Sequence, residues 1–139
     1  MKIIVITGPS ASGKTILSNK ISNIFKESII IKTDSFYRDD LILKFSSIFF
    51  DSTYDRLISI KKREIIKTIN SIYNKDENIY SYNYNFKTKK STRYSQKLKY
   101  FQDNFFIIIE GIFAHRLNLN YNETINIICY EKKDICFKR

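Results

Sequence analysis

The sequence predicts a single domain of the α/β class, over residues 1–139, in which a parallel β-sheet is flanked by helices and a Tyr/Lys-rich β-hairpin is inserted around residues 78–100. Short apolar runs, which are typical of buried parallel strands, alternate along the chain with segments in which apolar residues recur at helical spacing. A glycine-containing loop joins the first apolar run to the first helical segment. Because each helix returns the chain to the start of the next strand, this alternation favours a parallel sheet.

Four apolar runs are expected to form the strands of the sheet. The first run is bounded by Gly8, the second ends at Asp34, and the third is the most apolar run in the chain. Continuous apolar residues, without polar residues between them, are typical of strands that are buried in a parallel sheet. The expected strands are Lys2–Thr7, Ser28–Thr33, Phe105–Glu110 and Thr124–Tyr130.

Two segments have the apolar spacing of amphipathic helices. The first is Lys14–Lys26, and the second is a longer predicted helix, Thr53–Tyr73. The apolar positions of the first helix are Ile16, Leu17, Ile21, Ile24 and Phe25. The expected inner side of the second helix consists of Leu57, Ile58, Ile65, Ile66, Ile69 and Ile72.

The segment from Asp76 to Tyr100 has a different composition, because it is rich in Tyr, Asn, Ser and Lys. Between Tyr80 and Phe86 aromatic and polar residues alternate, which is the period of a strand or a hairpin. We therefore expect a partly exposed β-hairpin, inserted between the long helix and the third strand.

The loop after the first strand has the sequence Gly8-Pro9-Ser10-Ala11-Ser12-Gly13-Lys14-Thr15. Its two glycines allow the backbone N–H groups to converge on phosphate oxygens, and the following helix presents its positive N-terminus. In such a phosphate loop the lysine reaches the β- and γ-phosphates, and the hydroxyl after it binds Mg²⁺. The sequence thus predicts a P-loop NTPase fold with ATP and Mg²⁺ as cofactors. The expected nucleotide-binding residues are Gly8, Ser10, Ala11, Ser12, Gly13, Lys14 and Thr15.

Two acidic residues lie at the ends of predicted strands, where ligands of open parallel sheets gather. Asp34 is placed to accept a proton from an attacking hydroxyl or to bind Mg²⁺ through water, and the alternative is a cap on the next helix. Glu110 closes an apolar run and is costly to bury unless it is paired or near a metal. We expect it to contact Mg²⁺ or its water, with a structural salt bridge as the alternative.

The net charge of +10 is compatible with an anionic partner. However, Ile, Lys and Asn dominate the entire sequence, so we attribute the lysines to a general compositional bias and expect no nucleic-acid partner. The basic residues after the long helix are then a solvated face. They are Lys87, Lys89, Lys90, Arg93, Lys97 and Lys99.

The remaining features of the sequence are less specific. No run approaches the roughly 20 apolar residues of a membrane span, and the N-terminus has no signal cleavage site, so we expect a cytoplasmic protein. His115, the single histidine, is expected at the surface. Cys129 and Cys136 have the spacing of neither a redox pair nor a zinc site, and we expect ordinary thiols.

In their order along the chain, these motifs resemble those of the uridine kinase family of nucleoside kinases and its phosphoribulokinase-like relatives. The resemblance covers most of the chain. Gly8–Thr15 matches the family's phosphate loop, which is common to many kinases, whereas Asp34-Ser35-Phe36-Tyr37 is similar to the more specific Asp-Ser-Phe-Tyr motif. The resemblance implies that Asp34 is the catalytic base, also near Mg²⁺, and that Tyr37 lines the acceptor site.

Two further segments extend the resemblance. Phe50-Asp51-Ser52-Thr53-Tyr54-Asp55 is similar to the family's Phe-Asp-His-Pro-x-x-Phe-Asp segment, which implies that Asp51 binds ribose hydroxyls. Glu110-Gly111-Ile112 matches the family's Glu-Gly-Ile, which implies that Glu110 supports the metal site.

The chain departs from the family pattern at three places. Ser52 and Thr53 replace a histidine and a proline. The pyrimidine-reading segment Tyr-Asp-Phe-x-x-His corresponds to residues 84–89, in which Tyr84 is retained but Lys89 stands in place of the histidine. Asp134–Arg139 looks like the opening of the family's lid helix, so we expect a chain shortened at the C-terminus, with Arg116 or Arg139 as candidate substitutes for the lid arginines.

The preferred hypothesis is ATP-dependent phosphoryl transfer to a hydroxyl of a small molecule, most simply a nucleoside of the uridine or cytidine type. One alternative is a nucleotide-binding protein without catalysis, another is a kinase of a sugar phosphate or nicotinamide riboside, and a nucleic-acid-binding module ranks last. The oligomeric state is left open. The expected catalytic residues are Asp34 and Lys14, the acceptor-binding residues are Asp34, Tyr37, Asp51, Tyr84 and Lys89, and the metal-binding residues are Thr15, Asp34 and Glu110.

Overall fold

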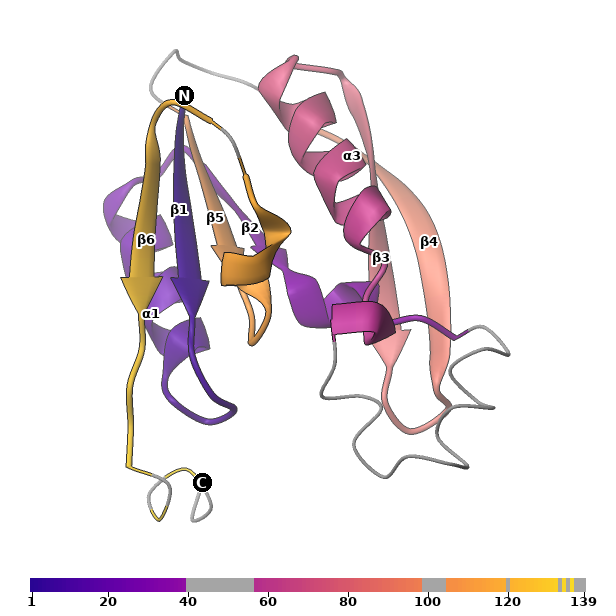
Figure 1. Ribbon diagram of the computed structural model, residues 1–139. Helices are drawn as coiled ribbons and strands as arrows, with labels where there is room; N and C mark the ends of the chain where they lie inside the picture. The colour runs from indigo at the N-terminus through magenta and orange to yellow at the C-terminus, as the bar shows by residue number, and fades with distance from the viewer. Residues whose placement is uncertain (40–56, 99–104, 120, 133, 135, 137–139) are drawn as a thin grey trace. The chain divides into compact units, whose positions relative to one another are not determined.

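The computed structural model describes residues 1–39, 57–98, 105–119, 121–132, 134 and 136. Its contacts divide the chain into two compact units, Met1–Thr33 with Tyr100–Arg139 and Asp34–Lys99. The first unit holds a four-stranded sheet and the second holds a two-stranded hairpin with a helix (Figure 1). The phosphate loop therefore belongs to the first unit, whereas the Asp-Ser-Phe-Tyr motif belongs to the second.

The sheet of the first unit is parallel and has the strand order β2-β5-β1-β6, which confirms the predicted α/β fold. All four strands point the same way, so their carboxyl ends meet at one edge (Figure 1). At this edge Glu110 of β5 lies opposite Ile6 of β1 on one side and Lys32 of β2 on the other. The strands are β1 (Lys2–Thr7), β2 (Ser28–Lys32), β5 (Phe106–Glu110) and β6 (Thr124–Ile128).

Helix α1 (Lys14–Ile24) follows the phosphate loop and packs on the sheet. Leu17 and Ile21 lie against the buried isoleucines of β1 and β5. The helix ends two residues earlier than predicted, because Phe25 caps it with an N–H donated to the carbonyl of Ile21 at 2.9 Å. The Phe25 ring instead stacks on Phe106, with ring centroids 4.2 Å apart.

In the second unit, helix α3 (Lys62–Tyr73) packs on an antiparallel hairpin of β3 (Asn78–Asn85) and β4 (Lys90–Lys97). The hairpin confirms the predicted insertion. Three isoleucines of α3, at helical spacing, have side chains that are 0% exposed, and Thr68 donates its hydroxyl to the carbonyl of Tyr80 at 2.6 Å. The isoleucines are Ile65, Ile69 and Ile72.

The prediction of one helix over Thr53–Tyr73 was wrong in its first part. Residues 53–56 lie outside the described residues, and Leu57–Ser59 forms a short 3₁₀-helix, η3. Ile60 then forms an antiparallel bridge with Tyr37. The backbone of this segment bonds to residues 36–38 and not along a helix, since the N–H of Arg38 donates to Ser59 and the N–H of Lys61 donates to Phe36, each at 2.8 Å.

Several apolar positions and strand ends also differ from the prediction. Ile16, Ile24 and Ile58 are mostly exposed, at 63%, 73% and 59%. Strand β2 ends at Lys32 because Thr33–Phe36 forms the 3₁₀-helix η1, and β6 ends at Ile128.

Among the described residues, no helix has both the length and the apolar character of a membrane span. Both cysteines, Cys129 and Cys136, are free thiols.

A substitution of Gly111, directly after β5, tests how tightly this residue packs against the segment that follows β2. Its φ is +151°, and a Cβ added there would lie 1.7 Å from Oγ1 of Thr33. Gly111→Ala is therefore expected to lower the free energy of unfolding by about 2–3 kcal/mol, through overpacking and backbone strain together. Chemical denaturation of the variant and the parent measures this.

The matched control is Gly13→Ala. Gly13 also has a positive φ, +88°, but a Cβ there meets nothing within 4 Å. This variant should lose only about 1 kcal/mol, the cost of the backbone conformation. Equal losses in the two variants would contradict the close contact between Gly111 and Thr33.

Candidate active site

The phosphate loop has the backbone conformation that its glycines predict. Gly8 and Gly13 have φ values of +152° and +88°, and Ala11 between them is also left-handed, with φ +59°. A Cβ at Gly8 would lie 2.2 Å from the carbonyl oxygen of Cys129 and 2.9 Å from Oγ of Ser12. Any side chain at position 8 would therefore displace the loop. Loops with turns of this kind form backbone nests that bind anions.

Two donors in the loop suit a phosphate group. The side chain of Lys14 is buried and its Nζ donates to the carbonyl of Pro9 at 2.6 Å. The hydroxyl of Ser12 is buried and has no hydrogen-bond partner within the described part of the chain. A buried hydroxyl without a partner is costly, and charged donors bind phosphate oxygens strongly. The residues present therefore fit a nucleotide's phosphates.

Glu110 connects the end of β5 with the start of α1. It is only 4% exposed, its Oε1 accepts a hydrogen bond from Thr15 Oγ1 at 3.2 Å, and its Oε2 accepts one from Ser18 Oγ at 3.0 Å. Nζ of Lys32 lies 3.9 Å from Oε1, so the carboxylate also has the ion pair that was the alternative prediction. A carboxylate beside a hydroxyl is a fitting set of oxygen ligands for Mg²⁺, which binds proteins through few carboxylates together with substrate phosphates.

Sequence reasoning did not single out Ser18 or Lys32. Ser18 lies three residues after Thr15 on α1, so the two share one helix face, and this spacing was a usable signal. Lys32 is the charged residue that ends an isoleucine run, as Glu110 does on the neighbouring strand. Only the strand order reveals that these two strand ends are neighbours.

His115 lies on the 3₁₀-helix η4 (Ala114–Leu117) and is exposed, as predicted. Its Nδ1 lies 2.9 Å from Oγ1 of Thr7, the residue before the phosphate loop, and Thr7 in turn donates to the carbonyl of Ile112 at 3.1 Å. Nε of Arg116 donates to Nε2 of His115 at 3.3 Å. These contacts tie the start of the phosphate loop to the segment after β5.

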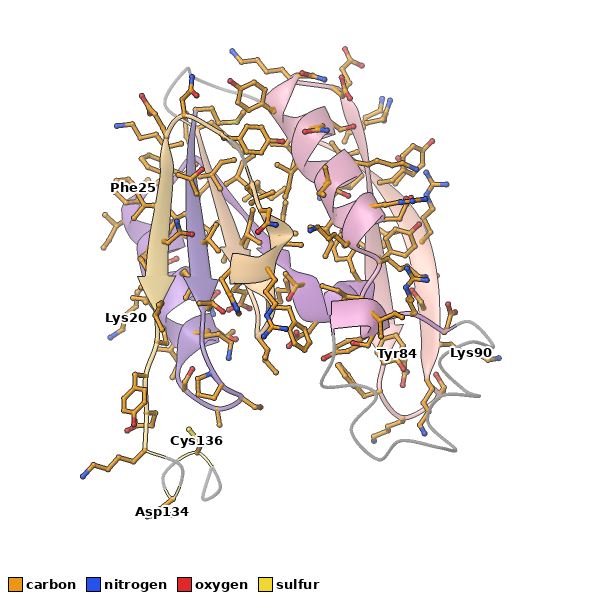
Figure 2. All side chains as sticks on the ribbon, in the orientation of Figure 1. Lys20, Phe25, Tyr84, Lys90, Asp134 and Cys136 are labelled. Atoms are coloured by element: carbon orange, nitrogen blue, oxygen red, sulfur yellow. The ribbon has the colours of Figure 1, made fainter. Side chains whose placement is uncertain are left out.

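In the second unit, the structure brings together two of the predicted acceptor residues. The rings of Tyr37 and Tyr84 lie 5.4 Å apart, and Phe86 completes a three-ring cluster at 5.6 Å from Tyr37 and 5.0 Å from Tyr84. Both tyrosines are buried, whereas Phe86 is 64% exposed. Tyr84 lies near the end of β3, close to the turn that leads to Lys90 (Figure 2).

The other predicted acceptor residues have different positions. Asp34 lies on η1 and is half-buried. Lys89, in the turn between β3 and β4, is exposed and has φ +53°. Asp51 lies outside the described residues. Lys87, Lys90, Arg93 and Lys97 are exposed, in agreement with a solvated face.

A polar network fixes the segment after Tyr37. The carboxylate of Asp39 accepts hydrogen bonds from the N–H of Ser91 at 2.9 Å and from Nζ of Lys61 at 3.3 Å. Nζ of Lys61 also donates to Oγ of Ser91 at 2.8 Å and lies 4.5 Å from the ring centre of Tyr82. Partial burial favours the neutral carboxyl, but the Ser91 hydrogen bond and the Lys61 charge outweigh it and lower the pKa of Asp39.

Asp39→Asn is expected to destabilise the protein by about 1 kcal/mol at pH 7, a figure that allows for solvent screening of this partly exposed pair. Because the folded pKa is below the unfolded value, the stabilisation is present above the unfolded pKa and is lost as the pH falls through the folded pKa. The difference between parent and variant should therefore shrink below about pH 4. Urea unfolding at several pH values measures it. Glu77→Gln, which changes an exposed carboxylate of the same unit, is the control. A deficit of Asp39→Asn that is constant down to low pH would contradict the ionic network.

The parallel sheet, the phosphate loop between β1 and α1, and the acid at the end of β5 define a P-loop nucleotide-binding protein. Residues 3–138 match the Phosphoribulokinase / Uridine kinase family, and the chain belongs to this family of kinases.

Curated relatives agree with this assignment, and a solved structure shares the fold. Uridine kinases of Borrelia duttonii and Borrelia hermsii are each 36% identical to this chain in alignments of 76 residues. These alignments cover 52% and 48% of this chain, respectively, and 37% of each relative. The matched region thus spans little more than a third of these relatives. Among solved structures, a kinase assigned to a fructose transport system of Silicibacter sp. TM1040 has a TM-score of 0.73 at 12% identity, over 97% of this chain and 68% of that one. At that identity the likeness shows the fold alone.

Proposed function

We propose that this chain transfers the γ-phosphoryl group of ATP to a hydroxyl of a small molecule, and that the acceptor is a nucleoside of the uridine or cytidine type. The observation that best supports this proposal is the hydrogen bond between Thr15, the last residue of the phosphate loop, and Glu110, at 3.2 Å. It brings a hydroxyl and a carboxylate together where the Mg²⁺ of an ATP complex is expected.

The first unit is proposed to hold the nucleotide. The backbone of Gly8–Gly13 and the Ser12 hydroxyl bind phosphate oxygens, and Lys14 leaves the Pro9 carbonyl to pair with the β- and γ-phosphates. Thr15 and Glu110 would hold Mg²⁺, which when bound supplies charge neutralisation for the transferred phosphoryl group. Positioning and charge neutralisation are the main sources of catalysis in phosphoryl transfer.

The second unit is proposed to supply the acceptor side. Asp34 accepts the proton of the acceptor hydroxyl. At the same time the oxygen of that hydroxyl bonds to the γ-phosphorus, the bond between this phosphorus and the β-phosphate oxygen breaks, and ADP leaves. Tyr37 and Tyr84 line the acceptor site, and Asp51 binds its hydroxyls. The ring cluster of Tyr37, Tyr84 and Phe86 supports a planar acceptor, because Phe86 leaves an aromatic face exposed.

Lys89 is proposed to bear on the choice among related acceptors. An ammonium donates hydrogen bonds but cannot accept them, so it favours carbonyl or phosphate oxygens on the acceptor. A sugar phosphate and nicotinamide riboside are therefore kept as further candidates. We also propose that residues 1–139 act as one kinase domain in the cytoplasm.

A coupled assay of ADP release with a panel of nucleosides and sugar phosphates tests this function. We expect release that depends on one acceptor class, with background hydrolysis of ATP in its absence. ATP binding without acceptor-dependent release for any member of the panel would instead support a nucleotide-binding protein without catalysis.

A further inference from the structure

Lys32 places a positive charge at the proposed metal site. It is the last residue of β2, and its backbone is the register partner of Glu110 on β5. Its Nζ lies 3.9 Å from Oε1 of Glu110, and this is the same oxygen that accepts the hydrogen bond of Thr15. The ammonium and a metal held by Thr15 and Glu110 would therefore share one carboxylate oxygen.

The geometry of this pair differs from that of a stabilising structural salt bridge. The side chain of Lys32 is 51% exposed, and 3.9 Å is near the outer limit for an ion pair. Exposed pairs of this kind contribute little to stability. Glu110 already has neutral donors on both oxygens, from Thr15 and Ser18, so its carboxylate is satisfied by hydrogen bonds independently of Lys32.

We propose that Lys32 is a resident cation that competes with a divalent metal for Glu110 and so weakens the binding of free metal. The proposal rests on the proposed function, since it takes Thr15 and Glu110 as metal ligands. Charges of +2 and +1 that share one oxygen ligand repel each other, even with partial exposure to water, by an amount worth about tenfold in affinity. The phosphates of a bound nucleotide offset this repulsion, so the metal binds more tightly with ATP than without it.

A titration of the nucleotide-free chain with Mn²⁺, followed by electron paramagnetic resonance, tests the proposal without any need for turnover. Lys32→Gln should bind Mn²⁺ about tenfold more tightly than the parent, and Lys32→Arg should bind it like the parent. Lys26→Gln is the matched control, because Lys26 is an exposed lysine of the same unit that precedes the amino end of β2. Its affinity should stay within about twofold of the parent.

The outcomes separate this proposal from the function on which it rests. If Lys32→Gln and Lys26→Gln bind Mn²⁺ equally, while Glu110→Gln binds it more weakly than the parent, the role of Lys32 is overturned and the metal site stands. If none of the proteins, Lys32→Gln included, binds Mn²⁺ without nucleotide, the role of Lys32 is overturned, and the same titration with ATP present tests the metal role of Glu110 separately. Thermal melting checks that each variant is folded. We expect the Lys32 variants to fold, because the side chain of Lys32 is half-exposed.

Discussion

Lys14→Met is expected to lower kcat/KM for phosphoryl transfer by a factor of about 10²–10³, and the variant should remain folded. The ammonium of Lys14 is buried at the phosphate loop and is hydrogen-bonded there to the carbonyl of Pro9. Methionine keeps the apolar stem and most of the length of the side chain but removes the charge that pairs with the β- and γ-phosphates. Coupled measurement of ADP release gives the rate, and calorimetric titration with ATP gives the affinity.

Lys20→Met is the control for this first prediction. Lys20 is an exposed lysine of the same helix (Figure 2), so its loss changes the net charge equally but leaves the loop unchanged. Its kinetic constants should stay close to those of the parent. A Lys14→Met variant whose kcat/KM lies within tenfold of the parent would contradict the assignment of the phosphate loop.

The second large effect is expected for Asp34→Asn. An amide cannot take the proton of the acceptor hydroxyl, so kcat should fall by a factor of about 10²–10⁴, the contribution of a general base. The affinity for ATP should change little, because the phosphates are bound by the loop of the first unit. Single-turnover kinetics with saturating acceptor separates the chemical step from binding.

Asp76→Asn changes an exposed carboxylate near the start of β3 and is the matched control for Asp34→Asn. It should leave both kcat and the ATP affinity unchanged. A retained kcat in Asp34→Asn would show that another group accepts the proton, and equal losses of ATP affinity and kcat would indicate a role in nucleotide binding only.

The sequence was sufficient to predict the sheet and the phosphate loop, since both depend on local patterns. The isoleucine runs of β1, β2 and β5 and the glycines at positions 8 and 13 each have one simple physical interpretation, and the structure agrees with it. The alternating aromatic residues of β3 likewise predicted a hairpin correctly.

The predictions that failed depend on long-range contacts. The helical spacing of apolar residues predicted that the helix begins at Thr53, before the observed start of α3. In the structure Ser59 and Lys61 instead form backbone hydrogen bonds with Arg38 and Phe36. No periodicity reveals such partners. Likewise, the neighbours of Glu110 come from α1 and β2, so the ion pair with Lys32 follows only from the order of the strands in the sheet.

The residues proposed for the acceptor side differ in how far the structure describes them. The structure places Tyr37 and Tyr84 in one ring cluster, which the family resemblance alone could not establish. Phe86 joins this cluster as an exposed ring, and nothing in the alternating pattern of β3 separated it from the other aromatic residues. The roles of Asp34, Asp51 and Lys89 toward an acceptor stay predictions.

The most direct test of the proposed function is the transfer of radiolabel from γ-³²P-ATP to a nucleoside by the 139-residue chain. With Mg²⁺ present, we expect labelled nucleoside monophosphate from the parent, and at least a hundredfold less from Asp34→Asn at equal ATP occupancy, in line with the loss of a general base of about 10²–10⁴. Label that is released only as inorganic phosphate, at the same rate with and without every nucleoside offered, would contradict the account.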